Sequence, residues 1–259
     1  SIVVMTVEYI YKYRYINIIN LPEKIRRQET EDSMNKLMIF GDSIFKGVTY
    51  SEEKKKYIIC EHNYADKLAA EGITTQNCCK MGATVWKIEQ ILDRKAQEID
   101  GDTAVLFEFG GNDSDFDWKA VSDDPLGKHI PKTVNNMFAS AYRSIIEKVK
   151  RMGATVVISN LVPIDADKYM QWISAGKSYD NIMTFLGDIS MLYRWQEYYN
   201  LTVEKIAQET GCKMLDVRNE FLVSHQYKSL ICCDGLHPTP KGHDAIDDII
   251  YDFIIKNKD

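Results

Sequence analysis

Lys36-Leu37-Met38-Ile39-Phe40-Gly41-Asp42-Ser43 is an apolar run that ends in a small polar turn. Short apolar runs bounded by turn residues are typical of strands that are buried on both faces. From residue 34 onward, similar runs alternate with amphipathic segments, which is the pattern of parallel strands joined by helices. Strands are expected at 36–40, 73–77, 103–109, 154–160 and 212–217, and helices at about 62–71, 84–98, 133–152, 189–210 and 239–256. We therefore predict an α/β fold, a three-layer α/β/α sandwich around five parallel strands.

Composition favours a globular protein that binds no nucleic acid. The chain has 259 residues, of which 45% are hydrophobic, so it can bury one full core. Its formal charge of −6 argues against a nucleic-acid surface, because such a surface needs clustered Lys and Arg. The basic run Lys54-Lys55-Lys56 follows two glutamates and is interpreted as a solvated loop or helix face.

The first 33 residues differ from the rest of the chain. Their apolar start, residues 2–5, is soon followed by Glu8 and Lys12, so neither a secretory leader nor a membrane span is expected. Tyrosines alternate with other residues over 7–15, which suits an edge strand or a homo-oligomer contact equally well. We treat 1–33 as an N-terminal extension of undecided role and 34–259 as one domain.

The six cysteines indicate free thiols rather than a metal site or a disulfide framework. They stand at 60, 78, 79, 212, 232 and 233, without a C-x-x-C pair or the Cys/His spacing of a zinc site. Neighbouring cysteines on a strand point to opposite faces and are poor partners for each other. We expect buried thiols, no bound metal and a cytoplasmic protein.

Three polar strings, each expected at a strand end, supply complementary chemistry. They are Gly41-Asp42-Ser43, Gly110-Gly111-Asn112-Asp113 and Asp234-Gly235-Leu236-His237. The ends of parallel strands line one crevice, so the three strings are expected to meet there. Ser43 is the candidate nucleophile, exposed on a strand-to-helix turn whose N–H groups face the reacting centre. Taken alone, its string is more simply a turn with a helix cap.

His237 is the candidate base. Asp234 lies three residues before it, so a tight loop lets the carboxylate hold one ring nitrogen while the other faces Ser43. A loop histidine that caps a helix would explain this string equally well. His243 is a competitor, but it falls in the expected last helix and has no acid three residues ahead.

Asn112 is the candidate oxyanion donor. Its neutral amide can stabilise negative charge on a carbonyl oxygen, and the two preceding glycines allow close approach of the backbone. By itself this string is more simply a turn after a strand. The occurrence of all three strings in this order makes three unrelated turns an improbable explanation.

Residues 34–257 resemble the SGNH, or GDSL, hydrolases. The resemblance rests on the three strings and on a further block at 77–84. It implies that Ser43 is the nucleophile, that Asp234 and His237 complete the triad, and that the N–H groups of Ser43 and Gly82 join Asn112 as oxyanion donors. It also implies a flavodoxin-like sheet of order 2-1-3-4-5 and ester or thioester hydrolysis without metal or cofactor. Cys79 departs from the Gly or Ser that several relatives carry, but Gly82 is intact.

Substrate choice is assigned to two long inserts, 113–132 and 161–188. Their aromatic side chains suit sugar rings or acyl chains, although packing of the inserts onto the body explains them equally well. The substrate-binding candidates are Asp42, Asp113, Trp118 and Trp172. We expect a serine esterase that hydrolyses short-chain acyl esters, such as acetyl groups on a carbohydrate or another small molecule. A lysophospholipase or thioesterase is the alternative, which a long apolar groove would favour.

Two readings from other classes remain open. Carboxylate, amide and imidazole groups also bind metals, so a metal-dependent phosphoesterase could use Asp42, Asn112, Asp113, Asp234 and His237. Few histidines stand beside these acids, which weakens that reading. A noncatalytic binding module is the other alternative, and it has no support because every expected catalytic position is filled.

Overall fold

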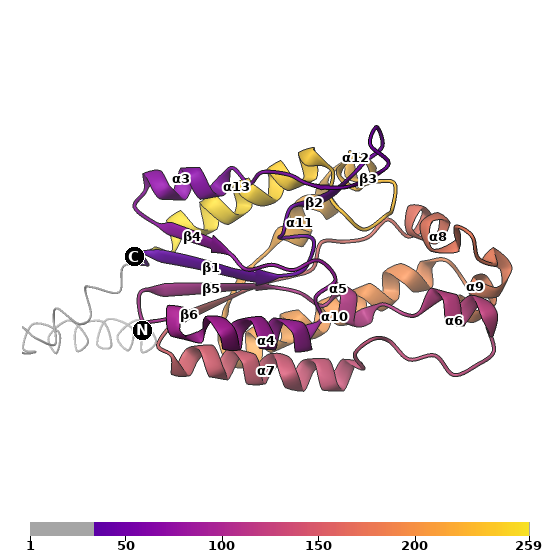
Figure 1. Ribbon diagram of the computed structural model, residues 1–259, viewed down its shortest axis with the longest axis horizontal. Coiled ribbons are helices and arrows are strands. Elements are labelled where there is room, and N and C mark those ends of the chain that lie inside the picture. The colour runs from indigo at the N-terminus through magenta and orange to yellow at the C-terminus, as the bar shows by residue number, and fades with distance from the viewer. Residues whose placement is uncertain (1–33, 259) are drawn as a thin grey trace, which may run out of the picture.

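A five-stranded parallel sheet forms the centre of the computed structural model, which describes residues 34–258 (Figure 1). The order β4-β1-β5-β6-β7 is 2-1-3-4-5 when these strands are numbered along the chain, as predicted. The strands are β1 (Lys36–Gly41), β4 (Thr74–Asn77), β5 (Thr103–Glu108), β6 (Thr155–Ser159) and β7 (Lys213–Leu215). The tyrosine-rich segment and the extension predicted at 1–33 lie outside the described residues.

Helices cover both faces of this sheet. One face carries α4 (Val85–Lys95), a single 3-10 turn (Ala96–Glu98), α7 (Asn135–Arg151) and α10 (Ser190–Thr210). The other carries α3 (Tyr64–Ala70), α11 (Val217–Val223), α12 (Tyr227–Leu230) and α13 (Pro240–Lys256). The three-layer α/β/α sandwich predicted from the sequence is thus present (Figure 1).

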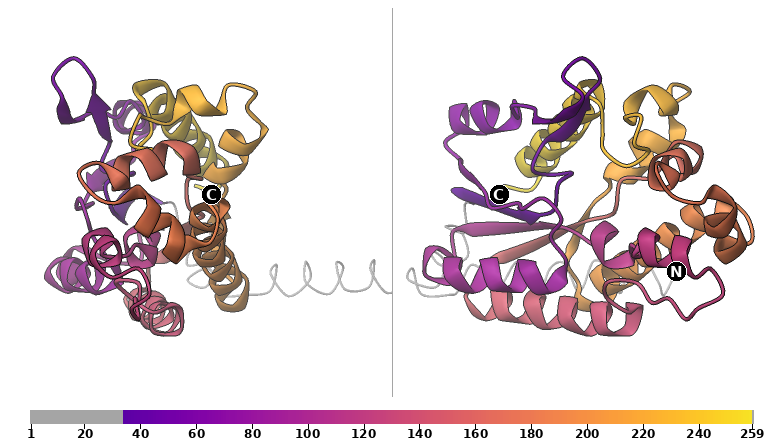
Figure 2. Two further views of the ribbon diagram at one scale, coloured as in Figure 1. Left: turned by 90° about the vertical axis from the view of Figure 1, so that its right-hand side faces the viewer. Right: turned by 45° about the vertical axis from the view of Figure 1, so that its right-hand side comes forward.

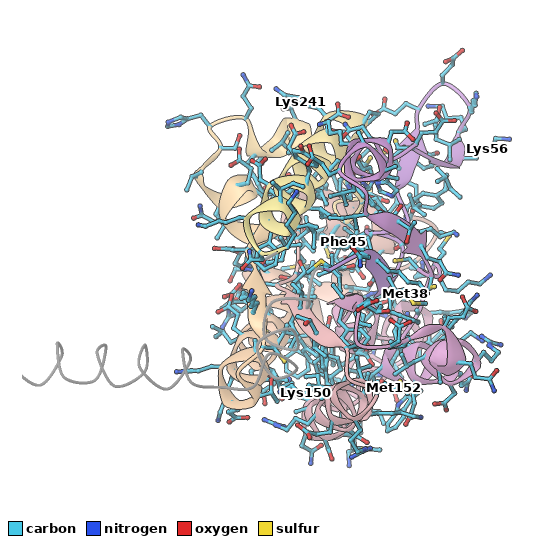
Figure 3. All side chains as sticks on the ribbon, turned by 90° about the vertical axis from the view of Figure 1, so that its left-hand side faces the viewer. Met38, Phe45, Lys56, Lys150, Met152 and Lys241 are labelled. Carbon is cyan, nitrogen blue, oxygen red and sulfur yellow. The ribbon has the colours of Figure 1, made fainter. Side chains whose placement is uncertain are left out.

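The pattern of β1 explains why two layers of helices are needed. Successive side chains of a strand point to opposite faces, and both faces of β1 are apolar. Met38 and Phe40 enter the core beneath α4 and α7, whereas Leu37 and Ile39 enter the core beneath α3 and α13. Figure 3 shows Met38 and Phe45 inside the molecule, in the cores on opposite faces of the sheet.

Short helices form a cap beyond the carboxyl ends of the strands (Figures 1 and 2). They are α5 (Gly111–Ser114), α6 (Trp118–Asp123), α8 (Ala166–Ser174) and α9 (Tyr179–Leu186). The side chains of Asp117, Asp165 and Ser178 accept N–H groups at the starts of α6, α8 and α9. The cap has an apolar cluster of its own, which includes Val121, Met170 and Ile182. The two inserts predicted from the sequence are therefore structured, and they roof the edge of the sheet where the three polar strings were expected.

A two-stranded hairpin follows Ser43 and corrects the prediction of a strand-to-helix turn. Residues 43–47 form turns, closed by a hydrogen bond of 3.0 Å from the Val48 N–H to the Ser43 carbonyl. The chain then enters β2 (Val48–Ser51) and returns antiparallel as β3 (Lys56–Ile59). The basic run 54–56 is the tip of this hairpin and the start of β3, with Lys56 at the edge of the molecule (Figure 3).

Within residues 34–258, no helix is both long enough and apolar enough to cross a bilayer.

Candidate active site

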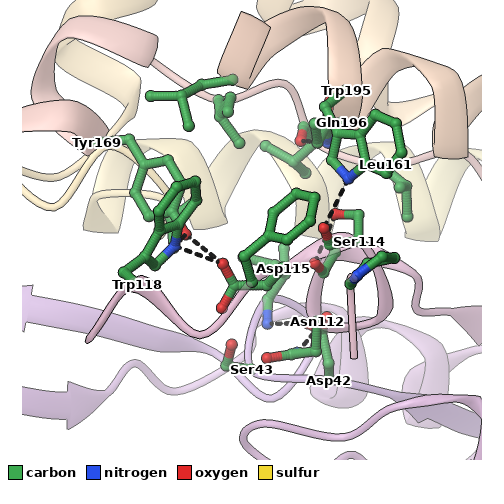
Figure 4. A pocket seen from close by; sticks show the side chains of 18 of the residues that line it. Asp42, Ser43, Asn112, Ser114, Asp115, Trp118, Leu161, Tyr169, Trp195 and Gln196 are labelled. Carbon is green, nitrogen blue, oxygen red and sulfur yellow. Dashed lines mark hydrogen bonds between the residues drawn. The ribbon is translucent and has the colours of Figure 1, made fainter. Parts of the chain in front are cut away.

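Ser43 lies in the turn after β1, where two hydrogen bonds from Asp42 fix the backbone. The Asp42 N–H donates to the carbonyl of Glu108 on β5 (3.1 Å), and its carboxylate accepts the Ile44 N–H (2.9 Å). These bonds tie the turn to the neighbouring strand and to itself. Ser43 is buried under the cap, and its side chain lines the floor of a cavity (Figure 4).

His237 joins Ser43 to Asp234 through both ring nitrogens. Its Nε2 lies 2.9 Å from the Ser43 Oγ, and its Nδ1 lies 2.6 Å from the Asp234 Oδ2. The other carboxylate oxygen, Oδ1, accepts the N–H groups of Leu236 and His237, each at 3.0 Å. The structure therefore brings together three groups that are 194 residues apart at their most distant, in the order nucleophile, imidazole, carboxylate.

Asp234 stays ionised although it is fully buried. Burial favours the neutral acid, but the hydrogen bond and positive charge of His237, together with the Leu236 and His237 N–H groups, outweigh burial and lower the pKa of Asp234. A buried carboxylate in this position fixes the imidazole orientation and stabilises the imidazolium that forms when the ring accepts a proton.

The loop that carries Asp234 and His237 does not follow a strand, contrary to the sequence prediction. It connects α12 to α13 and is closed by an isolated bridge between Ile231 and Pro238. Gly235 has a φ of +75°, and a Cβ there would lie 2.3 Å from the Tyr169 backbone nitrogen on α8. Only glycine fits this contact, which fixes the distance between the triad loop and the cap.

Asn112 lies near the start of α5, on the cavity floor beside Ser43 (Figure 4). One hydrogen of its amide is donated to the Asp42 Oδ2 at 3.0 Å, which leaves a second hydrogen for a ligand. Glu108 is buried next to Asp42, and its Oε2 has no hydrogen-bond partner among the described residues. Burial and the neighbouring Asp42 charge raise the pKa of Glu108 well above its usual range.

Gly82 lies in a neighbouring turn. It is exposed, with a φ of +72°, in the turn between β4 and α4. The N–H of Lys80 donates to the Gly41 carbonyl at 2.9 Å, so this turn runs beside the one that holds Ser43. Gly82 is not among the residues that line the cavity, whereas Ser43 and Asn112 are.

Asp113 has a structural position rather than the predicted position in a substrate site. Its side chain is fully buried and lies outside the cavity lining. Both carboxylate oxygens accept the Val85 N–H, at 3.1 Å, so Asp113 caps the first turn of α4 in place of Thr84, whose side chain makes no cap. Burial raises the pKa of Asp113 to about 6. This contact links the turn that carries Gly82 to the segment that carries Asn112.

The two tryptophans predicted to bind substrate take different positions. Trp118 lines the cavity, and its Nε1 donates to the Asp115 Oδ1 (2.8 Å) and the Tyr169 hydroxyl (3.0 Å). Trp172 does not line the cavity. It is partly exposed and packs edge-on against Tyr50 of the hairpin, with ring centroids 5.1 Å apart.

The cavity over Ser43 has a volume of about 410 Å³, within the range of small-molecule sites. Its walls are largely apolar and come from the cap and α10: Phe116, Trp118, Leu161, Val162, Ile164, Phe185, Leu186, Met191, Leu192 and Trp195. Two polar side chains of these walls, Trp195 and Gln196, are bonded within the protein. Trp195 donates to the Ser114 carbonyl at 2.8 Å (Figure 4). Gln196 donates to the Val162 carbonyl (2.9 Å) and accepts from Arg218 (3.2 Å).

The donors named for a metal site do not converge. Asp113 faces the Val85 N–H, and Asp234 is engaged with His237. In the described part of the chain, no three or more His, Cys, Asp or Glu side chains are grouped so as to hold a metal ion. The six cysteines, all within that part, are free, and Cys79 and Cys232 are buried.

Sequence reasoning missed the groups that surround the triad. Tyr57, on the hairpin, donates to the Asp234 Oδ2 at 3.0 Å across 177 residues of sequence. From the sequence, Glu108 was predicted only to lie in the strand 103–109, and Tyr169 only to lie in the insert 161–188. A charged residue at the end of an otherwise apolar strand, as Glu108 is in 103–109, was the one available signal.

The model of the GDSL-like Lipase/Acylhydrolase family matches residues 39–245. Among solved structures, a lipase/acylhydrolase from Enterococcus faecalis is similar, with 15% identity, a TM-score of 0.56, and coverage of 85% of this chain and 95% of that one. An acetylxylan esterase from Geobacillus stearothermophilus has 20% identity and a TM-score of 0.57, with coverage of 86% and 94%.

A lipolytic protein of the G-D-S-L family from Veillonella parvula has 15% identity, a TM-score of 0.56, and coverage of 86% and 97%. These structures share the fold of this chain. No curated protein sequence matches it. Since the family model spans most of the chain and includes all three polar strings, the protein belongs to the GDSL-like lipase/acylhydrolase family and is a carboxylic ester hydrolase.

Proposed function

We propose that the chain hydrolyses a small acyl ester by two-step acyl transfer, with Ser43 as nucleophile, His237 as base and Asp234 as the acid of the triad. The observation that carries this proposal is the continuous hydrogen-bond chain from the Ser43 Oγ through both nitrogens of His237 to Asp234, on the floor of a largely apolar cavity. A serine hydroxyl becomes a strong nucleophile when a positioned base takes its proton.

In the first step, the Ser43 Oγ attacks the ester carbonyl carbon as His237 Nε2 takes the hydroxyl proton. Asp234 stabilises the imidazolium through Nδ1–H. The Asn112 amide and the N–H groups of Ser43 and Gly82 are proposed to hold the oxyanion. His237 then protonates the leaving alcohol, and the acyl group remains on Ser43.

In the second step, His237 removes a proton from water, which attacks the acyl-enzyme carbonyl. Collapse of the second tetrahedral intermediate returns the proton from His237 to the Ser43 oxygen and releases the carboxylic acid. The proposed cycle uses no metal and no cofactor.

The cavity favours an acyl group larger than acetyl. A sugar ring needs polar partners for its hydroxyls, but the polar side chains of Trp118, Trp195 and Gln196 already donate to the protein. Unpaired hydroxyls buried against apolar walls would oppose binding. An alkyl or aryl chain gains free energy from the same walls. We therefore place an apolar acyl chain in the cavity, with the ester carbonyl at Ser43, as in the hydrolysis of a lysophospholipid, a thioester or another medium-chain ester.

Deacetylation of a carbohydrate is the second candidate. The observation in its favour is the similarity in fold to the acetylxylan esterase from Geobacillus stearothermophilus. An acetyl group would occupy only the floor of the cavity around Ser43 and Asn112, and the sugar would then lie outside the apolar walls.

The reaction is tested by hydrolysis of p-nitrophenyl esters with wild type and Ser43→Ala in the presence of a chelator. Loss of activity to the background rate in Ser43→Ala is expected, with full wild-type activity in the chelator. Ser114→Ala is the matched control, because the Ser114 hydroxyl also lies at the cavity but donates to the Gly111 carbonyl (2.8 Å). Activity in Ser43→Ala, or its loss on chelation, would contradict the mechanism.

The substrate is tested with the acetate, butyrate, hexanoate and octanoate esters, together with an acetylated xylo-oligosaccharide. We expect kcat/KM to rise from acetate to hexanoate by up to about 200-fold, because each of the four added methylenes contributes roughly 0.8 kcal/mol when it is buried. A maximum at acetate, with release of acetate from the oligosaccharide, would instead establish the deacetylase.

A further inference from the structure

The hairpin β2–β3 contacts the proposed triad at Asp234 and His237. Tyr57 of β3 donates its hydroxyl to the Asp234 Oδ2 at 3.0 Å, the same oxygen that accepts the His237 Nδ1–H. Its ring also packs on the imidazole, with centroids 4.9 Å apart and planes inclined by 56°. Tyr57 thus touches two of the three triad residues.

The hydroxyl of Tyr57 is fixed as a donor. Burial, followed by the charge of Asp234 and its hydrogen bond, raises the pKa of Tyr57 well above its usual range, and Cys233 and Cys232 act in the same direction. A protonated phenol facing a carboxylate oxygen can only donate to it. With Tyr57 and His237 on Oδ2 and two backbone N–H groups on Oδ1, Asp234 has four donors, which leaves it a single orientation.

Tyr57 is itself held by neighbours from two elements. Tyr50 is its cross-strand partner in the hairpin, with ring centroids 5.3 Å apart, and Trp172 of α8 lies 6.3 Å away. Tyr50 and Trp172 contact each other as well. This aromatic cluster of Tyr50, Tyr57 and Trp172 joins the hairpin to the cap next to His237.

We infer that Tyr57 is a positioning residue for hydrolysis, which holds the Asp234 carboxylate and the His237 ring in the geometry needed for proton transfer with Ser43. This inference rests on the proposed triad. It gives the hairpin a role in the reaction and explains the position of Trp172, which supports Tyr57 instead of lining the cavity. Tyr57 does not touch the reacting atoms, so its effect passes through Asp234 and His237.

Tyr57→Phe tests the inference, because it removes the hydroxyl and keeps the ring against His237. We expect kcat to fall by roughly 10-fold, the effect of losing one hydrogen bond to a charged group, with KM unchanged. The carboxylate, with one donor fewer, carries more charge toward the imidazolium, so the acid limb of the kcat/KM profile is expected to move to higher pH. Tyr50→Phe is the matched control, since its ring lies in the same cluster but its hydroxyl forms no hydrogen bond with the residues that the structure describes.

A double-mutant cycle with Asp234→Asn separates positioning from packing. If Tyr57 acts through Asp234, the cost of Tyr57→Phe should shrink to less than about 2-fold in the Asp234→Asn background, because contacting residues are energetically coupled. An equal cost in both backgrounds, or an equal loss in Tyr50→Phe, would overturn the inference. Ser43→Ala tells the two proposals apart: activity in that variant refutes the triad, whereas an inactive Ser43→Ala beside a fully active Tyr57→Phe refutes only the role of Tyr57.

Discussion

The Asn112 amide is held by one hydrogen bond to the Asp42 Oδ2 and has a second hydrogen free on the cavity floor. Asp42 in turn fixes the Ser43 turn through the Ile44 N–H. One carboxylate therefore positions both the nucleophile turn and the amide donor, which suggests that Asp42 acts through these groups more than through contact with substrate.

The substitution Asn112→Ala is expected to lower kcat by roughly 100- to 1,000-fold, because a preorganised oxyanion donor acts mainly in the transition state. KM should change much less. Steady-state kinetics with a p-nitrophenyl ester would measure both. Asn135→Ala is the control, since the Asn135 amide donates to Thr202 on α10, away from the cavity. Unchanged kcat in Asn112→Ala would refute the donor role.

Single residues of the site were predictable where they belong to a local string. Ser43, Asn112, Asp234 and His237 could be singled out because their three short strings occur together, in the order found in a known family, although each string alone is explained by a simple turn. The contact of Tyr57 with Asp234 could not be predicted, because the two residues are 177 positions apart in the sequence. The segment around Tyr57 shows only two short apolar stretches on either side of a basic run. Asp113 was predicted to bind substrate, but its carboxylate accepts the Val85 N–H at the start of α4. The sequence alone does not show whether a carboxylate next to Asn112 faces a ligand or a neighbouring helix.

Among the elements, the five parallel strands and their flanking helices followed from the alternation of apolar and amphipathic segments. The hairpin and the cap helices could not be predicted from this pattern, because they are short. Strands β2 and β3 have four residues each, and the helices α6, α8 and α9 have six to nine. Segments this short show too few periods to be distinguished from loops, and tertiary contacts decide their structure.

Helix α13 carries a histidine that should make stability depend on pH. The side chain of His243 is buried, its Nε2 donates to the Val48 carbonyl at 3.0 Å, and its Nδ1 has no hydrogen-bond partner within residues 34–258. Burial lowers the pKa of His243 to about 4, with a smaller contribution from His62, while the Val48 bond and Asp247 act in the opposite direction. His62 and Asp247 are themselves paired at 2.8 Å.

Between pH 6.5 and 4 the unfolded chain binds a proton at this residue and the folded chain does not, so the free energy of unfolding should fall as pH falls. The contribution is on the order of 3 kcal/mol over that window. Urea unfolding of wild type and His243→Gln at several pH values would measure it, and the variant should lose less stability on acidification. His225→Gln, at an exposed histidine, is the control. Parallel pH profiles for wild type and His243→Gln would refute this assignment.

At the scale of the whole molecule, the cavity is formed by segments that are far apart in the sequence and meet at one edge of the sheet. The floor comes from the turns after β1 and β5 and from the loop before α13, and the walls come from the cap and α10. The crevice at this edge was predictable from parallel topology. Its depth and apolar character were not, because they depend on how the two inserts fold over it, and the proposal of an acyl group larger than acetyl rests on these apolar walls.

Covalent labelling by an organophosphonate ester tests the central claim most directly, since such reagents phosphonylate an activated serine. We expect intact-mass and peptide analysis of the wild type, in the presence of a chelator, to show one adduct on Ser43. The adduct should be absent in Ser43→Ala and much slower to form in His237→Ala. An enzyme that hydrolyses esters but is labelled at another residue, or is labelled equally fast without His237, would contradict the proposed triad.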